Sequence, residues 1–302
     1  MESNKLISVC MIAYNHENSI REAIEGVLMQ ECNYRIELII TDDYSTDNTE
    51  TIVNSFNSHP RGGIIKYIRH PKNVGLFTNL MSNLENCSGD YIAFCEGDDY
   101  WIDPLKLEKQ VKFLESNNDI VLTFTSRVVL EADATQNKSI YSERLWSKND
   151  IYSNGAVFPL QTLVGRNYKF ELINFLSRFS HSYGFDKLIG YFYCLNGKVK
   201  SLEDITAVYR HNGQGIWSCY SRTEKAKLHI EESLKFYDTV VRENIDQVNV
   251  KELKYQLFKR IIDNNSNDNQ FLRLFSQEYK LSYRLKLKVL TRLFKNKIKA
   301  IA

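Results

Sequence analysis

Residues 89–99 read Gly-Asp-Tyr-Ile-Ala-Phe-Cys-Glu-Gly-Asp-Asp. The run from Tyr91 to Cys95 is almost wholly apolar, as expected of a strand that is covered on both faces. Three carboxylates, those of Glu96, Asp98 and Asp99, follow this run directly. Neighbouring carboxylates repel one another unless a cation or hydrogen-bond donors compensate their charge. The sequence therefore predicts a buried strand that ends at a ligand-binding site.

Strand and helix signals alternate on both sides of this stretch. Short joints between such units indicate a mostly parallel central sheet flanked by helices on both faces, which is the α/β class. Beyond residue 130 the pattern changes, and residues 131–152 predict a flexible loop or a hairpin. Strands are predicted at residues 6–13, 36–41, 64–69, 91–95, 120–130, 199–202 and 206–209, and helices at about 20–28, 45–56, 76–84, 104–114, 168–179 and 185–195.

Polar clusters follow three of the predicted strands, at residues 13–17, 42–47 and 96–99. In an open parallel sheet, ligands bind beyond the carboxyl ends of the strands. The carboxylates at 42, 43 and 47 are explained equally well by capping of the next helix. The cluster at 96–99 better suits Mg²⁺ or Mn²⁺, which prefer oxygen ligands and complete their shell with substrate phosphates. A phosphorylated or nucleotide substrate is the resulting prediction.

Two common phosphate-binding motifs are absent from the sequence. No Gly-x-Gly-x-x-Gly follows the first strand, and no Gly-x-x-x-x-Gly-Lys-[Ser/Thr] occurs. Phosphates would then be met by a metal and by cationic side chains, for which Arg166, Arg210, His211 and Lys72 are candidates.

The composition is that of a globular protein. The 302 residues are 43% hydrophobic and 25% charged, which suits about two domains, or one large domain with an appendage. We expect no secretory signal and no membrane-spanning segment, because no basic start precedes an apolar region and no apolar run approaches 18 residues. Six scattered cysteines without a Cys-x-x-Cys pair indicate reduced thiols in a cytoplasmic protein.

Several ordered segments of the chain resemble family 2 glycosyltransferases. The resemblance covers about residues 5–217 and implies the glycosyltransferase A fold, a nucleotide-diphosphate sugar donor with UDP-sugars favoured, Mn²⁺ or Mg²⁺, and an inverting displacement at the anomeric carbon. Without the Gln-x-x-Arg-Trp signature of processive synthases, addition of a single sugar is expected. The segments that carry the resemblance are 8–15, 38–49, 73–75, 89–99, 184–188 and 209–217.

The resemblance also implies roles for individual residues. Ala13, Tyr14, Asn15 and Glu17 lie where the family lines the nucleobase pocket, and Asp43 lies where a carboxylate accepts from the base N–H.

Other positions concern the diphosphate and the chemistry. Asp98 would lie near the ribose and, with Asp99, at the metal, while Asp186 would be the general base unless it only caps a helix. Arg210, and less securely His211, would face the leaving diphosphate. Arg166 is either a second anion contact or part of a structural ion pair.

The charge is unevenly distributed along the chain. Residues 280–302 carry eight basic and no acidic residues, whereas residues 1–279 carry 31 basic and 37 acidic ones, a net −6. This basic amphipathic tail predicts binding to an anionic membrane surface. The alternative is a terminal helix that packs on the protein with a solvated basic face. No nucleic-acid module accompanies the charge, so nucleic acid is not expected as a partner.

These observations combine into one prediction of organisation and function. Residues 1–220 would form the catalytic domain, with a nucleotide-sugar half (1–130) and an acceptor half (131–220), followed by a helical C-terminal extension (221–302). The enzyme would transfer one sugar to a lipid-linked oligosaccharide of a bacterial surface polysaccharide, such as O-antigen or capsule, as a peripheral protein on the inner face of the cell membrane. The alternatives are a sugar nucleotidyltransferase and a catalytically inactive sugar-nucleotide-binding module. The sugar, the base, the acceptor and the oligomeric state are not specified by the sequence.

Overall fold

The structure is a computed structural model that describes residues 4–154, 158–179, 184–211, 222–247, 249–264, 272–273 and 284–291. The chain divides into two compact units, which are described separately here. The first comprises Met1–Lys148 and Val157–Gly215, and the second comprises Asn149–Ala156 and Ile216–Ala302.

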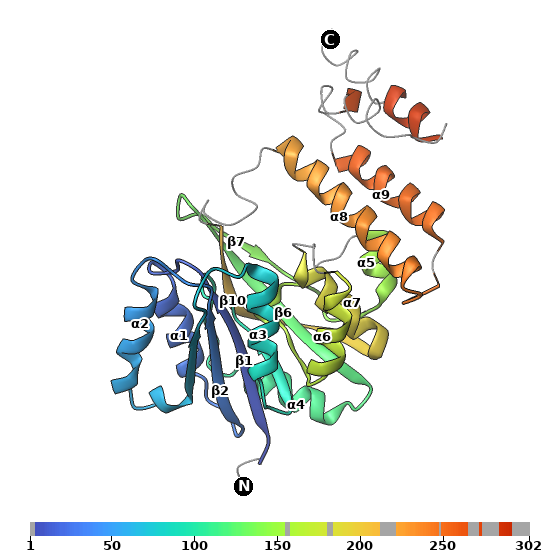
Figure 1. Cartoon of the computed structure of the whole chain (residues 1–302). Helices are drawn as coiled ribbons and strands as arrows, with labels where there is room; N and C mark the ends of the chain where they lie inside the picture. Colours follow the sequence, from blue (N-terminus) through green and yellow to red (C-terminus); the bar gives the residue numbers. More distant parts are fainter. Residues whose placement is uncertain are drawn as a thin grey trace. The chain divides into compact units, whose positions relative to one another are not determined.

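A single mixed sheet organises the described part of the first unit (Figure 1). Strands β3, β2, β1 and β4 are parallel neighbours, and β9 runs antiparallel between β4 and β6. Strand β6 therefore points the same way as β4, and β10 pairs parallel with β6. The order along the sheet is β3-β2-β1-β4-β9-β6-β10-β5, with β7 beside β6 and β8 beside β10. The strands are β1 (Leu6–Ala13), β2 (Arg35–Asp42), β3 (Ile65–Arg69), β4 (Tyr91–Phe94), β5 (Tyr100–Trp101), β6 (Ile120–Glu131), β7 (Gln136–Ser139), β8 (Leu145–Trp146), β9 (Val164–Arg166) and β10 (Lys198–His211).

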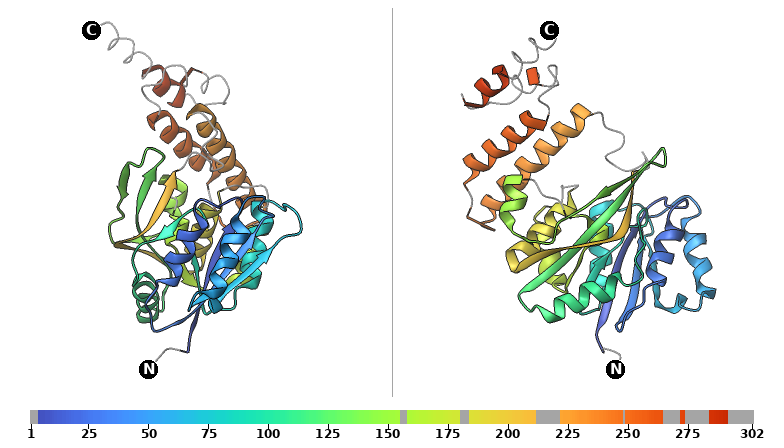
Figure 2. Two further views of the ribbon diagram at one scale, coloured as in Figure 1. Left: turned by 90° about the vertical axis from the view of Figure 1, so that its left-hand side faces the viewer. Right: turned by 180° about the vertical axis from the view of Figure 1, so that it is seen from behind.

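Helices cover both faces of the sheet, as the sequence predicts (Figures 1 and 2). On one face the Leu107 N–H at the start of α4 donates to Gln30 just after α1 (3.1 Å), and α1 also contacts α2. On the other face α3 contacts α6, and the rings of Phe77 and Phe185 bring α3 against α7. The first set is α1 (Ile20–Leu28), α2 (Thr49–Ser55) and α4 (Lys106–Ser116), and the second is α3 (Leu76–Asn86), α6 (Lys169–Ser177) and α7 (Phe185–Asn196).

The core follows from the apolar character of the inner strands. Ile7, Val9 and Met11 of β1 are fully buried, and Cys10 between them is 3% exposed. A strand buried on both faces has no polar side to alternate with, which explains the continuous apolar run. Burial of each such side chain contributes about 1.5–3 kcal/mol, which makes β1 a rigid base for the loop after Ala13.

Two predicted elements differ from the structure in detail, and one open alternative is decided by it. The helix predicted at 45–56 begins only at Thr49, because Asp47 accepts hydrogen bonds from the Thr49 N–H and hydroxyl and holds residues 43–48 in a loop. Of the two alternatives for residues 131–152, the hairpin is confirmed, since β7 pairs antiparallel with β6. The two strand pieces between 199 and 209 are one strand, β10, whose register shifts between Leu202 and Ile205 divide the apolar pattern.

The described part of the second unit is helical. Besides most of α5 (Lys148–Asn154) it contains α8 (Arg222–Arg242), α9 (Val250–Asn264) and a helix at residues 284–291. That last helix packs on α9 through an ion pair between Lys288 and Asp263 (2.6 Å) and through Arg284 over the Tyr255 ring. None of the described helices is both long enough and apolar enough to cross a membrane.

Candidate active site

The polar clusters predicted from the sequence meet at one edge of the sheet. Strands β1, β2, β4 and β10 all end there, at Ala13, Asp42, Phe94 and His211. In Figure 1 the chain enters the sheet at its lower edge, so these carboxyl ends lie at the upper edge.

The loop after β1 and the loop after β2 hold each other through side-chain hydrogen bonds. Asn15 donates its N–H to Ser45 Oγ (2.9 Å) and accepts from the Thr46 N–H (2.8 Å) through Oδ1. The Glu17 N–H donates to Asp47 (2.8 Å), and the Glu17 carboxylate accepts from the Asn48 side chain (2.8 Å). The side chains of Asn15 and Glu17 therefore build this rim of the site.

Tyr14 and Ala13 occupy different environments within the same rim. Ala13 is 2% exposed and its carbonyl accepts from the Asp43 N–H (2.9 Å), which ties β1 to the start of the β2 loop. Tyr14, in contrast, is 46% exposed at this rim.

The two aspartates at the end of β2 are fully engaged with the protein. Asp43 accepts from the Val74 N–H (2.6 Å) and the Gly75 N–H (3.0 Å). Asp42 accepts from the Ser45 N–H (2.7 Å) and the Tyr67 hydroxyl (2.6 Å). Neither caps α2. Asp43 instead fixes the turn at residues 73–75, where Gly75 has a φ of 84° that disfavours other residues.

The acidic loop after β4 is half-buried at Glu96 and Asp98 and buried at Asp99. Burial, together with the neighbouring carboxylates of Asp98 and Asp186, raises the pKa of Glu96 to about 8. Asp99 is 1% exposed, and burial beside Asp98 and Glu96 raises the pKa of its carboxyl well above the ordinary value. Its Oδ1 accepts from the Arg210 N–H (2.9 Å), whereas its Oδ2 has no hydrogen-bond partner among the described residues.

Arg210, near the end of β10, holds this acidic loop in place through several contacts. Its guanidinium donates to the Asp98 carbonyl (2.7 Å), forms an ion pair with Glu22, and lies over the Tyr100 ring. The sequence predicts a contact of Arg210 with the leaving diphosphate, but the contacts in the structure are those of a residue that positions Asp98 and Asp99. The neighbouring His211 pairs through Nδ1 with Glu131 (2.7 Å) at the same edge of the sheet.

Asp186 lies in the first turn of α7. Its Oδ1 accepts from the N–H of the next residue, Lys187 (2.7 Å), but Gly184 is the N-cap of α7 and no side-chain hydrogen bond caps the helix, so Asp186 does not act as its cap. Burial raises the pKa of the Asp186 carboxyl, and Asp186 in turn acts electrostatically on Glu96. The structure thus brings Asp186 into the field of the acidic loop, although 87 residues separate Asp186 from Asp99 in the sequence.

Arg127 of β6 is a member of this site that sequence reasoning missed. Its positive charge acts on the carboxyls of Glu96, Asp99 and Asp186 and lowers the pKa of each, against the effect of burial. Its guanidinium lies over the Tyr209 ring, 4.5 Å from the ring centroid. The only signal in the sequence was a lone cation inside the otherwise β-rich run 120–130.

The residues present suit a divalent cation that is shared with a ligand. No three histidine, cysteine or acidic side chains in the described part of the chain form a ready-made metal site. The buried Asp99 Oδ2 nevertheless lacks a donor, and carboxylate oxygens are the ligands that Mg²⁺ and Mn²⁺ prefer. Asp98 and Asp99 could hold such a cation only if a ligand, such as a diphosphate, supplied further oxygens.

Comparison with known proteins assigns the family. Residues 8–176, more than half of the chain, match the family model described as "Glycosyl transferase family 2". The chain belongs to glycosyl transferase family 2. The matched region contains the loops after β1, β2 and β4, but ends before Asp186 and Arg210.

Bacterial proteins are similar to this family 2 member in sequence. An uncharacterized protein of Mycobacterium tuberculosis is 32% identical over 230 residues, which cover 72% of this chain and 63% of that protein. This chain thus spans less than two thirds of the length of its mycobacterial relative. EpsE of Bacillus subtilis, provisionally named a glycosyltransferase, is 38% identical over 131 residues, covering 43% of this chain and 46% of EpsE.

Solved structures confirm the fold predicted for the family. TarS of S. aureus in complex with UDP-GlcNAc superimposes with a TM-score of 0.60 at 15% identity, covering 96% of this chain and 79% of the TarS chain. The mannosyltransferase PcManGT of Pyrobaculum calidifontis, in complex with GDP-Man and Mn²⁺, gives a TM-score of 0.57 at 15% identity and covers 97% of this chain and 87% of its own. The chain has the glycosyltransferase A fold, with helices following it.

Arg166 does not belong to the candidate site of this family 2 member. It pairs with Tyr91 in the register of β9 and β4, which places it where β4 begins rather than where it ends. Its guanidinium donates to the carbonyls of Ile120 (3.1 Å) and Leu114 (2.6 Å). Both alternatives offered by the sequence, an anion contact and a structural ion pair, are therefore replaced by a link between α4 and β6.

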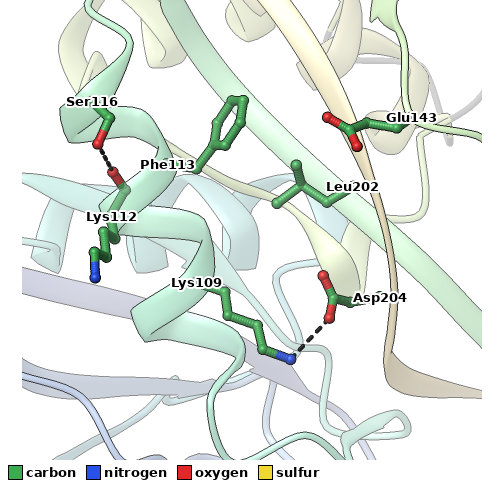
Figure 3. Close-up of a pocket in the computed structure, with 7 residues that line it drawn as sticks. All are labelled: Lys109, Lys112, Phe113, Ser116, Glu143, Leu202 and Asp204. Carbon is green, nitrogen blue, oxygen red and sulfur yellow. Dashed lines mark hydrogen bonds and ion pairs between the residues drawn. The ribbon is translucent and has the colours of Figure 1, made fainter.

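A shallow pocket of about 420 Å³ lies elsewhere on the surface of this family member, between α4 and β10 (Figure 3). Lys109 on one side forms an ion pair with Asp204 on the other (2.8 Å), and also with Asp103 (2.8 Å). The charge of Lys109 is thus already offset, and none of the predicted site residues lines this pocket.

Proposed function

We propose that the protein is an inverting glycosyltransferase that uses a nucleotide-diphosphate sugar and a divalent cation. The observation that carries the proposal is that Asp98 and Asp186 both act electrostatically on Glu96, and Asp98 and Glu96 on the buried Asp99, at the carboxyl ends of the strands. Family membership supports it, and so do the nucleotide sugars in the titles of two structures that share the fold.

Each part of the site has a task in this reaction. Asp186 takes the proton of the acceptor hydroxyl as the oxygen attacks the anomeric carbon, and the bond from that carbon to the diphosphate breaks with inversion. Asp98 and Asp99 would hold Mg²⁺ or Mn²⁺, which when bound offsets the charge of the diphosphate. The Tyr14 ring, Asn15, Glu17 and Asp43 lie on the rim that we assign to the nucleoside, which in our proposal is uridine.

The raised pKa of Asp186 suits a general base, because a base works best when its pKa approaches the working pH. Only the ionised carboxylate can accept the proton. Activity should therefore be lost as the pH falls through the raised pKa of this group.

Our proposal for the acceptor is based on the C-terminal helices and on the names of similar proteins. TuaG of Bacillus subtilis, provisionally named a teichuronic acid biosynthesis glycosyltransferase, is 29% identical over 162 residues, covering 53% of this chain and 62% of TuaG. We assign to this chain a lipid-linked oligosaccharide acceptor of a bacterial surface polysaccharide. The helix at 284–291 exposes Leu287 and Leu290 (53% and 62%), and this apolar surface beside basic residues suits an anionic membrane.

The test measures transfer by the purified protein with Mn²⁺, a panel of nucleotide sugars and a lipid-linked acceptor. Asp186→Asn should reduce transfer by about 10²–10⁴-fold while the donor still binds, since only the base is lost. Asp99→Asn should weaken both donor binding and transfer. The exposed Asp133→Asn on the β6–β7 hairpin is the matched control and should behave as the wild type.

The outcomes separate the proposal from its rivals. Near-normal transfer by both Asp186→Asn and Asp99→Asn would overturn the assignment of the site. Tight donor binding without any turnover would identify an inactive sugar-nucleotide-binding module instead.

A further inference from the structure

Two buried hydrogen-bond donors in the site have no partner among the described residues. They are Nε of Arg127 on β6 and Nε2 of Gln161 in the short 3₁₀ helix η3 (Leu160–Thr162). The Gln161 side chain is 1% exposed. Leaving such a donor unpaired destabilises the protein, and buried polar groups are otherwise nearly always paired. Two unpaired donors on neighbouring side chains therefore indicate a place where a ligand supplies oxygen atoms.

The two donors belong to one group of side chains. The Arg127 Nη1 donates to Gln161 Oε1 (3.4 Å), so guanidinium and amide lie next to each other. The Tyr209 ring covers one side of the guanidinium. Guanidinium, amide and aromatic ring together offer directed N–H donors beside an apolar face, a combination that suits a sugar ring with its hydroxyl groups.

Arg127 acts electrostatically on the carboxyls of Glu96, Asp99 and Asp186. The two unpaired donors, Nε of Arg127 and Nε2 of Gln161, can each bind an oxygen of a sugar hydroxyl group. The ligand class that these donors and the neighbouring ring suit is a sugar.

Given the proposed function, the position of Arg127 indicates which sugar of the reaction these donors bind. Arg127 acts on Asp99, which we place at the diphosphate, and on Asp186, which we place at the acceptor hydroxyl. The transferred sugar must lie between these two points, because its anomeric carbon is bonded to the diphosphate before the reaction and to the acceptor afterwards.

We propose that Arg127 and Gln161 bind hydroxyl groups of the sugar that is transferred and so select among donor sugars. The inference rests on the proposed function and adds to it two residues that recognise the sugar rather than the nucleotide. Hydrogen bonds from a buried site to a substrate hydroxyl discriminate strongly, because an analogue that lacks the hydroxyl, or presents it elsewhere, leaves the protein group unpaired.

Suitable variants keep the local structure. The Gln161 backbone carbonyl, not its side chain, accepts from the Trp101 indole (2.7 Å), so Gln161→Met retains this contact and the side-chain volume. Arg127→Lys retains the charge beside the three carboxyls and removes Nε. Lys138→Ala on the neighbouring strand β7 is exposed and serves as the matched control.

The experiment measures calorimetric binding of the nucleoside diphosphate and of its nucleotide sugar, both with Mn²⁺, to the full chain. We expect Gln161→Met and Arg127→Lys to bind the nucleoside diphosphate within about twofold of the wild type and the nucleotide sugar about 5–50-fold more weakly. Their preference for the cognate sugar over its epimers should fall in parallel, and Lys138→Ala should change neither affinity.

Different results overturn different claims. If both affinities fall equally, or if only the acceptor KM rises, the assignment of Arg127 and Gln161 to the sugar is wrong and the proposed function stands. A wild-type protein that binds no nucleotide sugar at all would overturn the proposed function and this inference with it.

Discussion

At the scale of single residues, Lys106 is a buried cation next to the candidate active site. Its side chain is fully buried, lies over the Trp101 ring, and donates to the carbonyl of Thr162 (3.0 Å) and to the side chain of Gln110. Burial lowers the pKa of its ammonium group to about 7, although Cys95 and Asp103 favour the charged form. A lysine in this state is close to losing its proton at neutral pH.

This lowered pKa predicts a pH dependence of stability. Between pH 7 and about 10.5 the unfolded chain binds more protons at this lysine than the folded one, so the contribution of Lys106 to the free energy of unfolding should rise with pH in that window, by roughly a few kcal/mol. The difference between the wild type and a variant that lacks the lysine isolates this contribution. Lys106→Met should flatten the rise. Urea unfolding of both proteins at pH 7, 8.5 and 10 would test this, and parallel pH profiles would contradict it.

Gly97 is the small residue between the carboxylates of the acidic loop. A Cβ atom there would lie 2.7 Å from His16 Nδ1, 2.8 Å from the Ile20 side chain and 3.1 Å from the Ile12 carbonyl. The loop therefore packs against the end of β1 without space for a methyl group.

Gly97→Ala should consequently destabilise the protein by about 1–3 kcal/mol and reduce transfer, because the loop that bears Asp98 and Asp99 must move. Gly63→Ala is the control, since a Cβ at Gly63 meets nothing within 4 Å. Thermal unfolding and transfer rates of the two variants would show the contrast. Equal behaviour of both would mean that the loop tolerates displacement.

Arg166 links two elements, α4 and β6, at the edge of the sheet opposite to the site. Because its guanidinium donates only to backbone carbonyls within the described part of the chain, Arg166→Ala should lower the free energy of unfolding by about 2 kcal/mol and leave the donor KM unchanged. Denaturation and donor titration measure the two effects separately. A large rise in the donor KM in a stable variant would return Arg166 to the site.

Elements were predictable from sequence where one local pattern determines them. The apolar runs of β1 and β4 and the polar residues after them gave the strands, their common edge and the acidic loop. Residues whose role depends on partners far away in the sequence were harder to predict. Arg127 was missed because its carboxyl partners lie on other segments, and Arg166 was misplaced because the sequence does not reveal that β9 runs antiparallel. Asp43 was recognised as part of the site, but its bonds to residues 74 and 75 were not.

At the scale of the whole molecule, the feature to explain is the combination of basic charge and exposed apolar side chains near the C-terminal end. Of the predicted tail, residues 280–283 and 292–302 lie outside the described residues. Within the described helix, Leu285 and Val289 are buried (2% each) while Leu287 and Leu290 are exposed. One apolar row of this helix thus packs on the protein, as the packing alternative requires, while binding of the exposed row to a membrane stays a prediction.

We predict that the double variant Leu287→Gln and Leu290→Gln binds anionic vesicles more weakly but transfers sugar to a soluble acceptor as the wild type does. Deletion after residue 279 should have the larger effect, because it also removes eight basic residues. Sedimentation with vesicles of anionic and of neutral lipid, at low and high salt, measures the binding. Equal binding to both lipids would remove the electrostatic part of the proposal, and unaltered binding of the double variant would remove the apolar part.

The mutual hydrogen bonds between the loops after β1 and β2 have a consequence for the kinetics of recognition. Asn15, Glu17 and Asp47 fix these loops to each other within the protein alone, so the conformational entropy of this rim is lost during folding and not when a ligand arrives. Such a preorganised rim needs no slow closing step before it engages a nucleoside. Encounter with the ligand, rather than rearrangement of these loops, would then set the association rate there.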